Sequence, residues 1–236
     1  MTELVKLHSA SSSQLPDFVE PMKAKLVNSM PCGNWIYEVK LDGYRALALR
    51  GGSETRILSR NQKDLGGKFP EVKDSIAALD VQVAIIDGEI VALDEKGRSS
   101  FQLLQSFDMG QEKPPILFYA FDLLRLNGKN LQSLPIEERK AKLEDLLKKP
   151  PGVVRYSVSF TKDAQELLSR ARELGLEGLI GANAVAPGMN PENAPEHGSS
   201  SSSIRSKNLL SANTPSRRGL EIFWSAACWL PRRQET

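Results

Sequence analysis

The sequence predicts an α+β fold in which antiparallel sheets carry flanking helices, and three observations support this prediction. Up to about Gly181, short apolar runs with a period of two alternate with turn dipeptides such as Asp42-Gly43 and Asn127-Gly128. Helical patterns stand between groups of strands and not after every strand, which argues against a doubly wound parallel sheet. The 236 residues include 31 Lys and Arg, 29 Asp and Glu and 40% hydrophobic residues, the balance of one medium-sized globular domain.

The first clear strand pattern begins at Trp35. Apolar and charged side chains alternate from Trp35 to Asp42, which places the apolar residues on one face and the charged ones, including Lys40, on the other. Asp42-Gly43 predicts a turn and residues 44–49 a return strand, so we expect a hairpin here.

The later elements follow from turn and capping signals as much as from periodicity. Pro70 suits the first turn of a helix, Thr161 suits a helix N-cap, and Gly175 suits a helix end. The elements expected after the hairpin are a strand over 55–59, a helix over 69–79, strands over 83–86 and 89–93 around an Asp87-Gly88 turn, a buried strand over 116–124, and helices from Pro135 to Lys148 and from Thr161 to Gly175.

Charge, cysteine content and hydropathy exclude several classes of protein. Cys32 and Cys228 are too few and too far apart for a disulfide framework or a four-cysteine metal site, which favours a reduced compartment. No run approaches the ~20 apolar residues of a membrane span, and the N-terminus lacks a secretory pattern. We therefore expect a cytoplasmic protein with no membrane contact. A net charge of +2 does not by itself indicate nucleic acid, so that argument has to come from particular residues.

The segment from Glu38 to Arg45, Glu-Val-Lys-Leu-Asp-Gly-Tyr-Arg, carries the most chemical information. Lys40 lies on the polar face with a carboxylate two residues away on each side, and the following turn brings Arg45 near. A solvated charged face explains this pattern without any function, and the six-residue pattern alone does not separate that reading from a catalytic lysine.

The rest of the chain favours catalysis, because the sequence resembles the adenylation domain of ATP-dependent DNA ligases, and most of all the ligase module of bacterial end-joining enzymes. The resemblance covers roughly residues 18–181, with five motifs in the family's order. The matching segments are Lys40-Leu41-Asp42-Gly43-Tyr44-Arg45, Ser59-Arg60-Asn61, Asp87-Gly88-Glu89, Phe101-Gln102 with Phe118-Tyr119-Ala120-Phe121-Asp122-Leu123-Leu124, and Glu177-Gly178-Leu179-Ile180-Gly181.

The resemblance implies covalent nucleotidyl transfer with ATP and Mg²⁺ or Mn²⁺ as cofactors. Lys40 would attack the α-phosphate and carry AMP as a phosphoramidate, and the adenylate would then pass to a DNA 5′-phosphate that a 3′-hydroxyl attacks. The attack requires a neutral amine, so a lysine in this role needs a nearby cation or a desolvated site. Glu89 and Glu177 match the family's metal-binding positions, and their hard oxygen ligands suit Mg²⁺.

Five further residues receive roles only through the resemblance. Glu38 matches a contact to the adenine amino group, and Phe121 matches the ring that stacks on adenine. Arg45 matches a ribose contact, Arg60 a phosphate contact, and Asp42 the second catalytic residue of the motif, used mostly in the later DNA steps. Without the family, Phe121 would be read as core and Arg60 as an exposed surface residue.

The partners that the resemblance implies are nicked or broken double-stranded DNA, together with fused polymerase or nuclease modules or separate end-joining proteins. The protein itself is expected to be a monomer that works at the bacterial nucleoid. Three alternatives stay open at this point. The chain could be an RNA ligase or a capping-type guanylyltransferase, an inactive nucleotide-binding remnant, or an unrelated α+β domain.

The family pattern breaks after Gly181, where the family has a lysine and this chain has Ala182. The family's later W-I-K-x-K motif is missing, and residues 182–236 contain nine serines and no Asp. We therefore divide the chain into a flexible lead-in over 1–18, the adenylation domain over 19–181, and an aberrant, disordered or frameshifted tail over 182–236, without the oligonucleotide-binding domain that follows in the family. Such a chain is expected to leave a sheet edge open where the missing motif would pair, and to adenylate itself poorly.

A shifted reading frame accounts for this break. Starting at the third base of the Ala182 codon, the genetic code allows the peptide K-R-S-R-S-R-Y-E-P-G-K-R-T-G-A-W-I-K-F-K, which contains the missing motif. We expect the genomic DNA across codons 178 to 205 to encode that motif in another frame. Codons that cannot produce W-I-K-x-K in any frame would refute this explanation.

Overall fold

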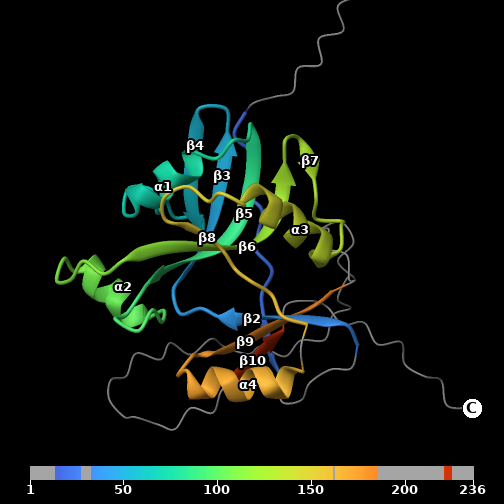
Figure 1. Ribbon diagram of the computed structural model, residues 1–236. Coiled ribbons are helices and arrows are strands. Elements are labelled where there is room, and N and C mark those ends of the chain that lie inside the picture. Colours follow the sequence, from blue (N-terminus) through green and yellow to red (C-terminus); the bar gives the residue numbers. More distant parts are fainter. Residues whose placement is uncertain (1–13, 28–32, 162, 185–220, 225–236) are drawn as a thin grey trace, which may run out of the picture.

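The computed structural model describes residues 14–27, 33–161, 163–184 and 221–224, which form two sheets with flanking helices (Figure 1). The smaller sheet has the strand order β1-β10-β9-β2, and the larger one has the order β4-β3-β5-β6-β7 with β8 paired to β6. All pairings are antiparallel except β9 with β10 and β6 with β8. The α+β class is confirmed, with mixed rather than purely antiparallel sheets.

The strands are β1 (Lys25–Val27), β2 (Trp35–Lys40), β3 (Tyr44–Gly51), β4 (Glu54–Ser59), β5 (Val83–Ala92), β6 (Ile116–Leu126), β7 (Lys129–Asn130), β8 (Val154–Tyr156), β9 (Gly178–Asn183) and β10 (Glu221–Trp224). The helices are α1 (Pro70–Ala77), α2 (Phe101–Asp108), α3 (Ile136–Leu146) and α4 (Ala164–Glu173).

The predicted hairpin between the first two long strands is wrong, because β2 and β3 lie in different sheets. Tyr37 and Glu38 pair with β9, whereas β3 pairs on both sides with β4 and β5. The Asp42-Gly43 pair is therefore a crossing between the sheets. A Cβ on Gly43 would lie 2.2 Å from the Ile90 carbonyl oxygen, so only glycine fits where the crossing chain meets β5. The charged face of β2 consequently points toward the larger sheet.

The two strands predicted around Asp87-Gly88 form the single strand β5, which is another correction. Its register against β6 shifts at Ile85/Ile86 and again at Asp87/Gly88. Gly88 therefore marks an irregularity within a strand, a position that isolated glycines often occupy.

Gly88→Ala is expected to lower the free energy of unfolding by about 1–3 kcal/mol, the usual cost of overpacking. A Cβ at this position would lie 2.4 Å from the Phe118 ring and 2.6 Å from the Tyr119 carbonyl oxygen. Urea unfolding measures the loss, and Gly67→Ala is the matched control because nothing lies within 4 Å of its Cβ position. Equal stability of the two variants would contradict this account of β5.

Two helices differ from the prediction, one in being present at all and the other in its N-cap. Helix α2, which the sequence did not predict, has Ser100 as its N-cap, with the side chain accepting a hydrogen bond from the Leu103 amide. Helix α4 is capped by Asp163, not by Thr161, because the Asp163 carboxylate accepts hydrogen bonds from the Gln165 and Glu166 amides. The predicted end at Gly175 is confirmed by its positive φ of 68°.

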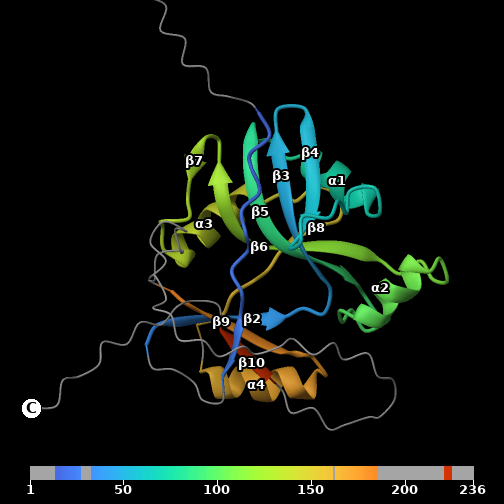
Figure 2. The ribbon, with the colours of Figure 1, turned by 180° about the vertical axis from the view of Figure 1, so that it is seen from behind.

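The described chain begins before the predicted boundary at residue 19. The N-terminal segment runs along the back of the larger sheet toward β1 (Figure 2), and Leu15, Phe18 and Val19 pack there. Their contacts are Leu47, Leu49, Ile85 and Leu124. Residues 14–18 are thus packed against the sheet, whereas residues 1–13 lie outside the described ranges.

The part of the tail that the structure describes forms sheet. Strand β9 continues past Gly181 to Asn183, and Glu221–Trp224 pairs in parallel with Gly178–Gly181. The expected open edge at β9 is therefore wrong, because β10 lies between β9 and β1. The serine run, both cysteines and most of the tail lie outside the described residues.

Candidate active site

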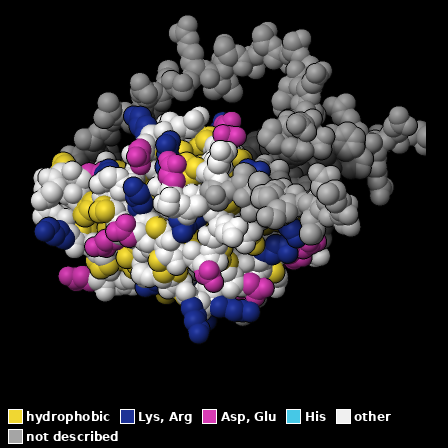
Figure 3. Space-filling model, turned by 90° about the horizontal axis from the view of Figure 1, so that it is seen from above, with side chains coloured by type: hydrophobic (Ala, Val, Ile, Leu, Met, Phe, Trp, Pro, Cys, Tyr) yellow, Lys and Arg dark blue, Asp and Glu magenta, His cyan; other side chains and the backbone are white. Residues whose placement is uncertain are grey.

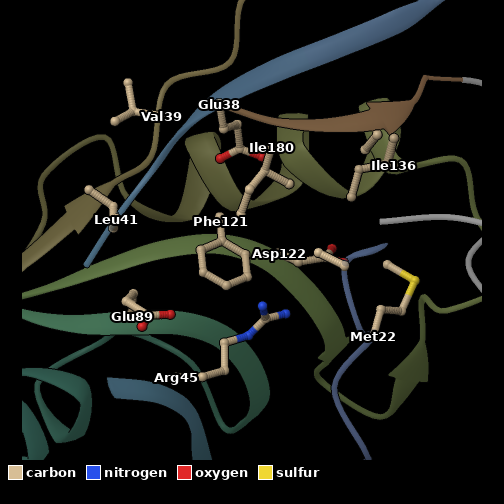
Figure 4. A pocket seen from close by; sticks show the side chains of 12 residues that line it. Met22, Glu38, Val39, Leu41, Arg45, Glu89, Phe121, Asp122, Ile136 and Ile180 are labelled. Carbon is tan, nitrogen blue, oxygen red and sulfur yellow. The ribbon is translucent and has the colours of Figure 1, made fainter. Parts of the chain in front are cut away.

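A pocket lies between the two sheets, where the chain crosses from β2 to β3 (Figure 4). Four of the site residues predicted from the sequence line it, and they come from β2, β3, β5 and β6. They are Glu38, Arg45, Glu89 and Phe121. In Figure 4 the Phe121 ring stands at the centre, with Glu38 above it, Arg45 below it and Glu89 to one side. The other lining residues are mostly apolar, and they include Met22, Ile136, Ile180 and Ala182.

Lys40 forms an ion pair with Glu177, the residue just before β9. The partners meet because β2 and β9 run antiparallel and Lys40 stands opposite Gly178, the next residue after Glu177. The Lys40 side chain is 20% exposed and that of Glu177 39%. The predicted nucleophile and one predicted metal ligand are therefore in direct contact and open to solvent.

Glu89 is held in an environment that disfavours its charge. Burial raises the pKa of Glu89 to about 8, and the nearby Asp87 and Glu177 carboxylates add to this, while Arg45 and Lys40 act in the opposite direction. A carboxyl group in this state is stabilised when a cation binds next to it. Lys40, Glu89 and Glu177 thus form one electrostatically coupled group at the edge of the pocket.

Glu89→Gln is expected to change how stability depends on pH. A carboxyl group with a pKa of about 4.5 in the unfolded chain and about 8 in the folded one favours folding fully below pH 4.5, and this contribution is lost as the pH rises toward 8. The loss is at most about 1.4 kcal/mol per pH unit. Urea unfolding between pH 5 and pH 8.5 should therefore show Glu89→Gln gaining stability relative to the wild type as the pH rises. Parallel pH curves for the two proteins would contradict this environment for Glu89.

Arg45 is fixed from two sides. It donates two hydrogen bonds to Asp87, of 2.7 and 2.8 Å, and its guanidinium lies 4.4 Å from the centroid of the Phe121 ring. Asp87 stands opposite Asp122 across the sheet, and Asp122 forms its own two hydrogen bonds, of 2.8 and 2.9 Å, with the buried Arg139. Two ion pairs therefore lie next to each other at the larger sheet, and the pair with Asp87 holds Arg45 against the Phe121 ring.

The structure places a buried lysine, which the sequence did not single out, beside Glu38. Lys140 of α3 is 3% exposed, and its ammonium lies 3.0 Å from Glu38 Oε2. Burial raises the pKa of Glu38, and the Lys140 charge opposes that shift. In the sequence, Lys140 stands in the run Glu137-Glu138-Arg139-Lys140, which has the composition of a solvated helix face. The helical period that brings Ile136, Lys140 and Leu143 to one buried side was the available signal.

Asp42 and Arg60, like Lys40 and Glu177, do not line this pocket. The Asp42 carboxylate accepts a hydrogen bond of 3.0 Å from the Phe101 amide, and the Asp42 amide donates one of 3.0 Å to Ser99 Oγ. Asp42 thus ties the crossing to the start of α2. Arg60 is exposed and lines an adjoining groove that also contains Arg45 and Glu89.

A bound metal ion would have to use the carboxylates of Glu89, in β5, and Glu177, just before β9. The described residues contain no group of three or more His, Cys, Asp or Glu side chains placed to hold an ion. Glu89 and Glu177 nevertheless provide two carboxylates near Lys40, and Mg²⁺ commonly uses one or two carboxylates together with substrate phosphates and water. The residues present therefore fit a Mg²⁺ ion that arrives with a nucleotide.

Comparison with known proteins identifies the family. Residues 16–186 match the family model of the ATP dependent DNA ligase domain. The chain belongs to the ATP-dependent DNA ligase family. The multifunctional non-homologous end joining protein LigD of Pseudomonas aeruginosa is 39% identical over 175 residues, which is 73% of this chain and 21% of LigD. DNA ligase C1 of Mycolicibacterium smegmatis is 32% identical, over 72% of this chain and 53% of its own length.

Solved ligase structures show the same fold. The ligase domain of LigD from M. tuberculosis has a TM-score of 0.58 at 26% identity, over 67% of this chain and 51% of that domain. A mycobacterial DNA ligase D complexed with ATP and MES has a TM-score of 0.57 at 21% identity, over 88% of this chain and 58% of that one. The predicted resemblance and fold are thus confirmed. The chain spans only about a fifth of the P. aeruginosa LigD that it matches.

The position that interrupts the family motif lies inside the pocket. Ala182 is 8% exposed, stands opposite Ile36 in β2, and lines the pocket with Phe121 and Glu38. Where the resemblance implies a lysine, this chain therefore has a methyl group at the pocket wall.

In the described ranges, no helix combines the length and the apolar character that a membrane crossing requires.

Proposed function

We propose that this chain is the adenylating part of a DNA ligase, which forms a covalent lysyl-AMP on Lys40 from ATP. The observation that carries the proposal is the position of Lys40 at the sheet crossing, in contact with Glu177 and beside the pocket that contains Phe121, Arg45 and Glu89. A nucleophilic lysine next to a pocket with one aromatic ring and several charged groups suits capture of a nucleoside triphosphate.

Different residues of the pocket contact different parts of ATP in this proposal. We infer that the base lies against Phe121 with its amino group toward Glu38, and that Arg45 contacts the ribose. The Lys40 amine attacks the α-phosphorus, so that a P–N bond forms, the bond to the β-phosphate oxygen breaks and pyrophosphate leaves. The amine loses its proton first, and Glu177 is the carboxylate in contact with it.

We infer that Glu89 and Glu177 hold Mg²⁺ when ATP binds. The ion would neutralise charge on the phosphates during transfer. The raised pKa of Glu89, about 8, supports this role, because an adjacent cation favours the ionised carboxylate. Because the ion would also bind Glu177, it would weaken the ion pair between Glu177 and the Lys40 ammonium.

The proposed second substrate is nicked or broken double-stranded DNA. Lys and Arg side chains are interspersed with Asp and Glu on the face shown in Figure 3, so phosphate contacts would come from particular residues. Arg60, Lys63 and Lys68 line the groove next to Glu89 and are candidates for such contacts. We place Asp42 in the later DNA steps, where its hold on α2 would orient that side of the site.

The cellular setting is also a proposal. The 39% identity to an end-joining protein supports work on broken DNA in the bacterial cytoplasm, at the nucleoid, together with polymerase or nuclease modules or separate end-joining proteins. We retain a monomer as the working form. We also keep the proposal that the tail arises from a frameshift, which would leave this chain with weak adenylation activity.

Labelling with α-labelled ATP and Mg²⁺ tests the proposal. The expected product is a protein-bound adenylate that resists alkali and is released by acid, as a phosphoramidate is. GTP should not replace ATP, and transfer should go to nicked DNA and not to nicked RNA, which separates a DNA ligase from an RNA ligase or a capping enzyme. ATP binding without covalent label, even at long times, would instead support a nucleotide-binding remnant.

A further inference from the structure

Lys140 is a buried cation placed behind the wall of the pocket. Its side chain is 3% exposed, and its ammonium donates hydrogen bonds to the carbonyl oxygens of Phe121, at 3.3 Å, and Ser157, at 3.0 Å. It also lies 5.0 Å from the centroid of the Tyr156 ring. Burial of a lysine is costly unless a specific charge compensates it. The compensating carboxylate is that of Glu38, 3.0 Å away, which lines the pocket.

Lys140 acts on Glu38 mainly through its charge. Two of its donors are used by the carbonyl oxygens of Phe121 and Ser157, and the buried Glu38 Oε2 accepts no well-directed hydrogen bond from the described part of the chain. The Glu38 side chain also lines the pocket, so a group of a bound ligand can contact its carboxylate there. Its ability to accept there depends on whether the carboxylate is ionised.

Among the groups that act on Glu38, Lys140 favours the ionised carboxylate most strongly. Burial raises the pKa of Glu38 and Asp122 raises it further, whereas the Lys140 charge and a hydrogen bond from the Ser157 side chain lower it. Tyr156 stays neutral near pH 7, since burial, Glu144 and Glu38 raise its pKa to about 12. The charged or titratable groups that face Glu38 or share its pocket are Lys140 of α3, Asp122 of β6, Tyr156 of β8, Arg45 of β3 and Glu89 of β5.

We propose that Lys140 sets the base selectivity of the pocket by keeping Glu38 ionised. The inference rests on the proposed function, in which the purine of ATP lies in this pocket. An ionised carboxylate only accepts hydrogen bonds, so it suits the amino group at C6 of adenine and repels the carbonyl oxygen at C6 of guanine. A protonated carboxyl group donates a hydrogen bond and suits guanine. Lys140 is thus a positioning residue that selects adenine through Glu38.

The test compares ATP and GTP binding by calorimetry in the wild type, Lys140→Met and Lys140→Arg, from pH 6 to pH 9. We expect Lys140→Met to lose about ten- to a hundredfold of the preference for ATP near pH 7, the value of one hydrogen bond to a charged group. The preference should return as the pH rises and Glu38 ionises. Lys140→Arg should keep it, and so should Lys142→Met, which removes an exposed lysine from the same helix.

Two further measurements keep the inference testable if Lys140→Met does not fold. Glu38→Gln, whose amide both donates and accepts, should show little preference for ATP at any pH. A carbon-13 NMR titration of the Glu38 carboxyl group in the wild type and in Lys140→Arg should give similar midpoints, and a higher midpoint in any folded variant that lacks the cation.

If Lys140→Met has the same ratio of ATP to GTP affinity as the wild type at every pH, the inference is wrong and the proposed function still stands. The same holds if Glu38→Gln keeps the full preference. Failure of the wild type to bind either nucleotide would overturn the proposed function and this inference with it.

Discussion

Ala182→Lys is expected to raise the rate of self-adenylation by about a hundredfold, because removal of a single preorganised charge-stabilising group from an enzyme site typically costs about 10²–10³ in rate. Ala182 lines the pocket on the same face of the smaller sheet as Glu38, since Ala182 stands opposite Ile36 and Glu38 stands opposite Ile180. A lysine there has a four-carbon stem that would carry its ammonium into the pocket, toward the phosphates of a bound nucleotide.

The gain is measured as the initial rate of labelling with α-labelled ATP and Mg²⁺. Ala182→Met is the matched control, because methionine has similar length and no charge. Asn183→Lys places the same charge on the other face of β9 and should have little effect. A similar gain in Ala182→Met would show that filling the pocket, and not charge, limits the reaction. No gain in a folded Ala182→Lys would show that the family's cation is not what this chain lacks.

Local alternation predicted the faces of β2 correctly, but it did not predict the sheet to which each strand belongs. Trp35 and Tyr37 pack against Ala164 of α4, and Glu38 lines the pocket, as the two-residue period requires. The hairpin failed because an Asp-Gly pair fits a tight turn and a sheet crossing equally well. The choice is made by distant partners, above all β9, which lies more than a hundred residues further along the chain.

The same limit applies to the candidate site. Of the nucleotide-binding residues that the resemblance implied, Glu38, Arg45, Glu89 and Phe121 line one pocket, whereas Arg60 and Glu177 do not. Lys140 was missed because the charged run around it has the composition of a solvated helix face, although its helical spacing from Ile136 and Leu143 indicated the buried side. The family pattern ends at Gly181, but pairing with β2 carries strand β9 on to Asn183.

Lys40→Ala is expected to abolish the covalent adenylate, with a loss of at least about four orders of magnitude, because no other group can form the same bond to the α-phosphorus. The fold should be nearly unaffected. Lys40 contacts the partly exposed Glu177, and pairs of this kind contribute only about 0–1 kcal/mol. ATP binding should also persist, because Phe121, Glu38 and Arg45 remain in place.

The comparison is sharpest in a background of Ala182→Lys, where the label should be strong. Lys63→Ala removes another exposed lysine near the site and serves as the control for charge. Three readouts separate the causes of a loss: covalent label, ATP affinity and urea unfolding. Loss of label alone assigns the nucleophile to Lys40. Retention of an acid-labile adenylate in Lys40→Ala would place the nucleophile elsewhere, and loss of ATP affinity in the folded variant would show that Lys40 acts in binding and not in covalent transfer.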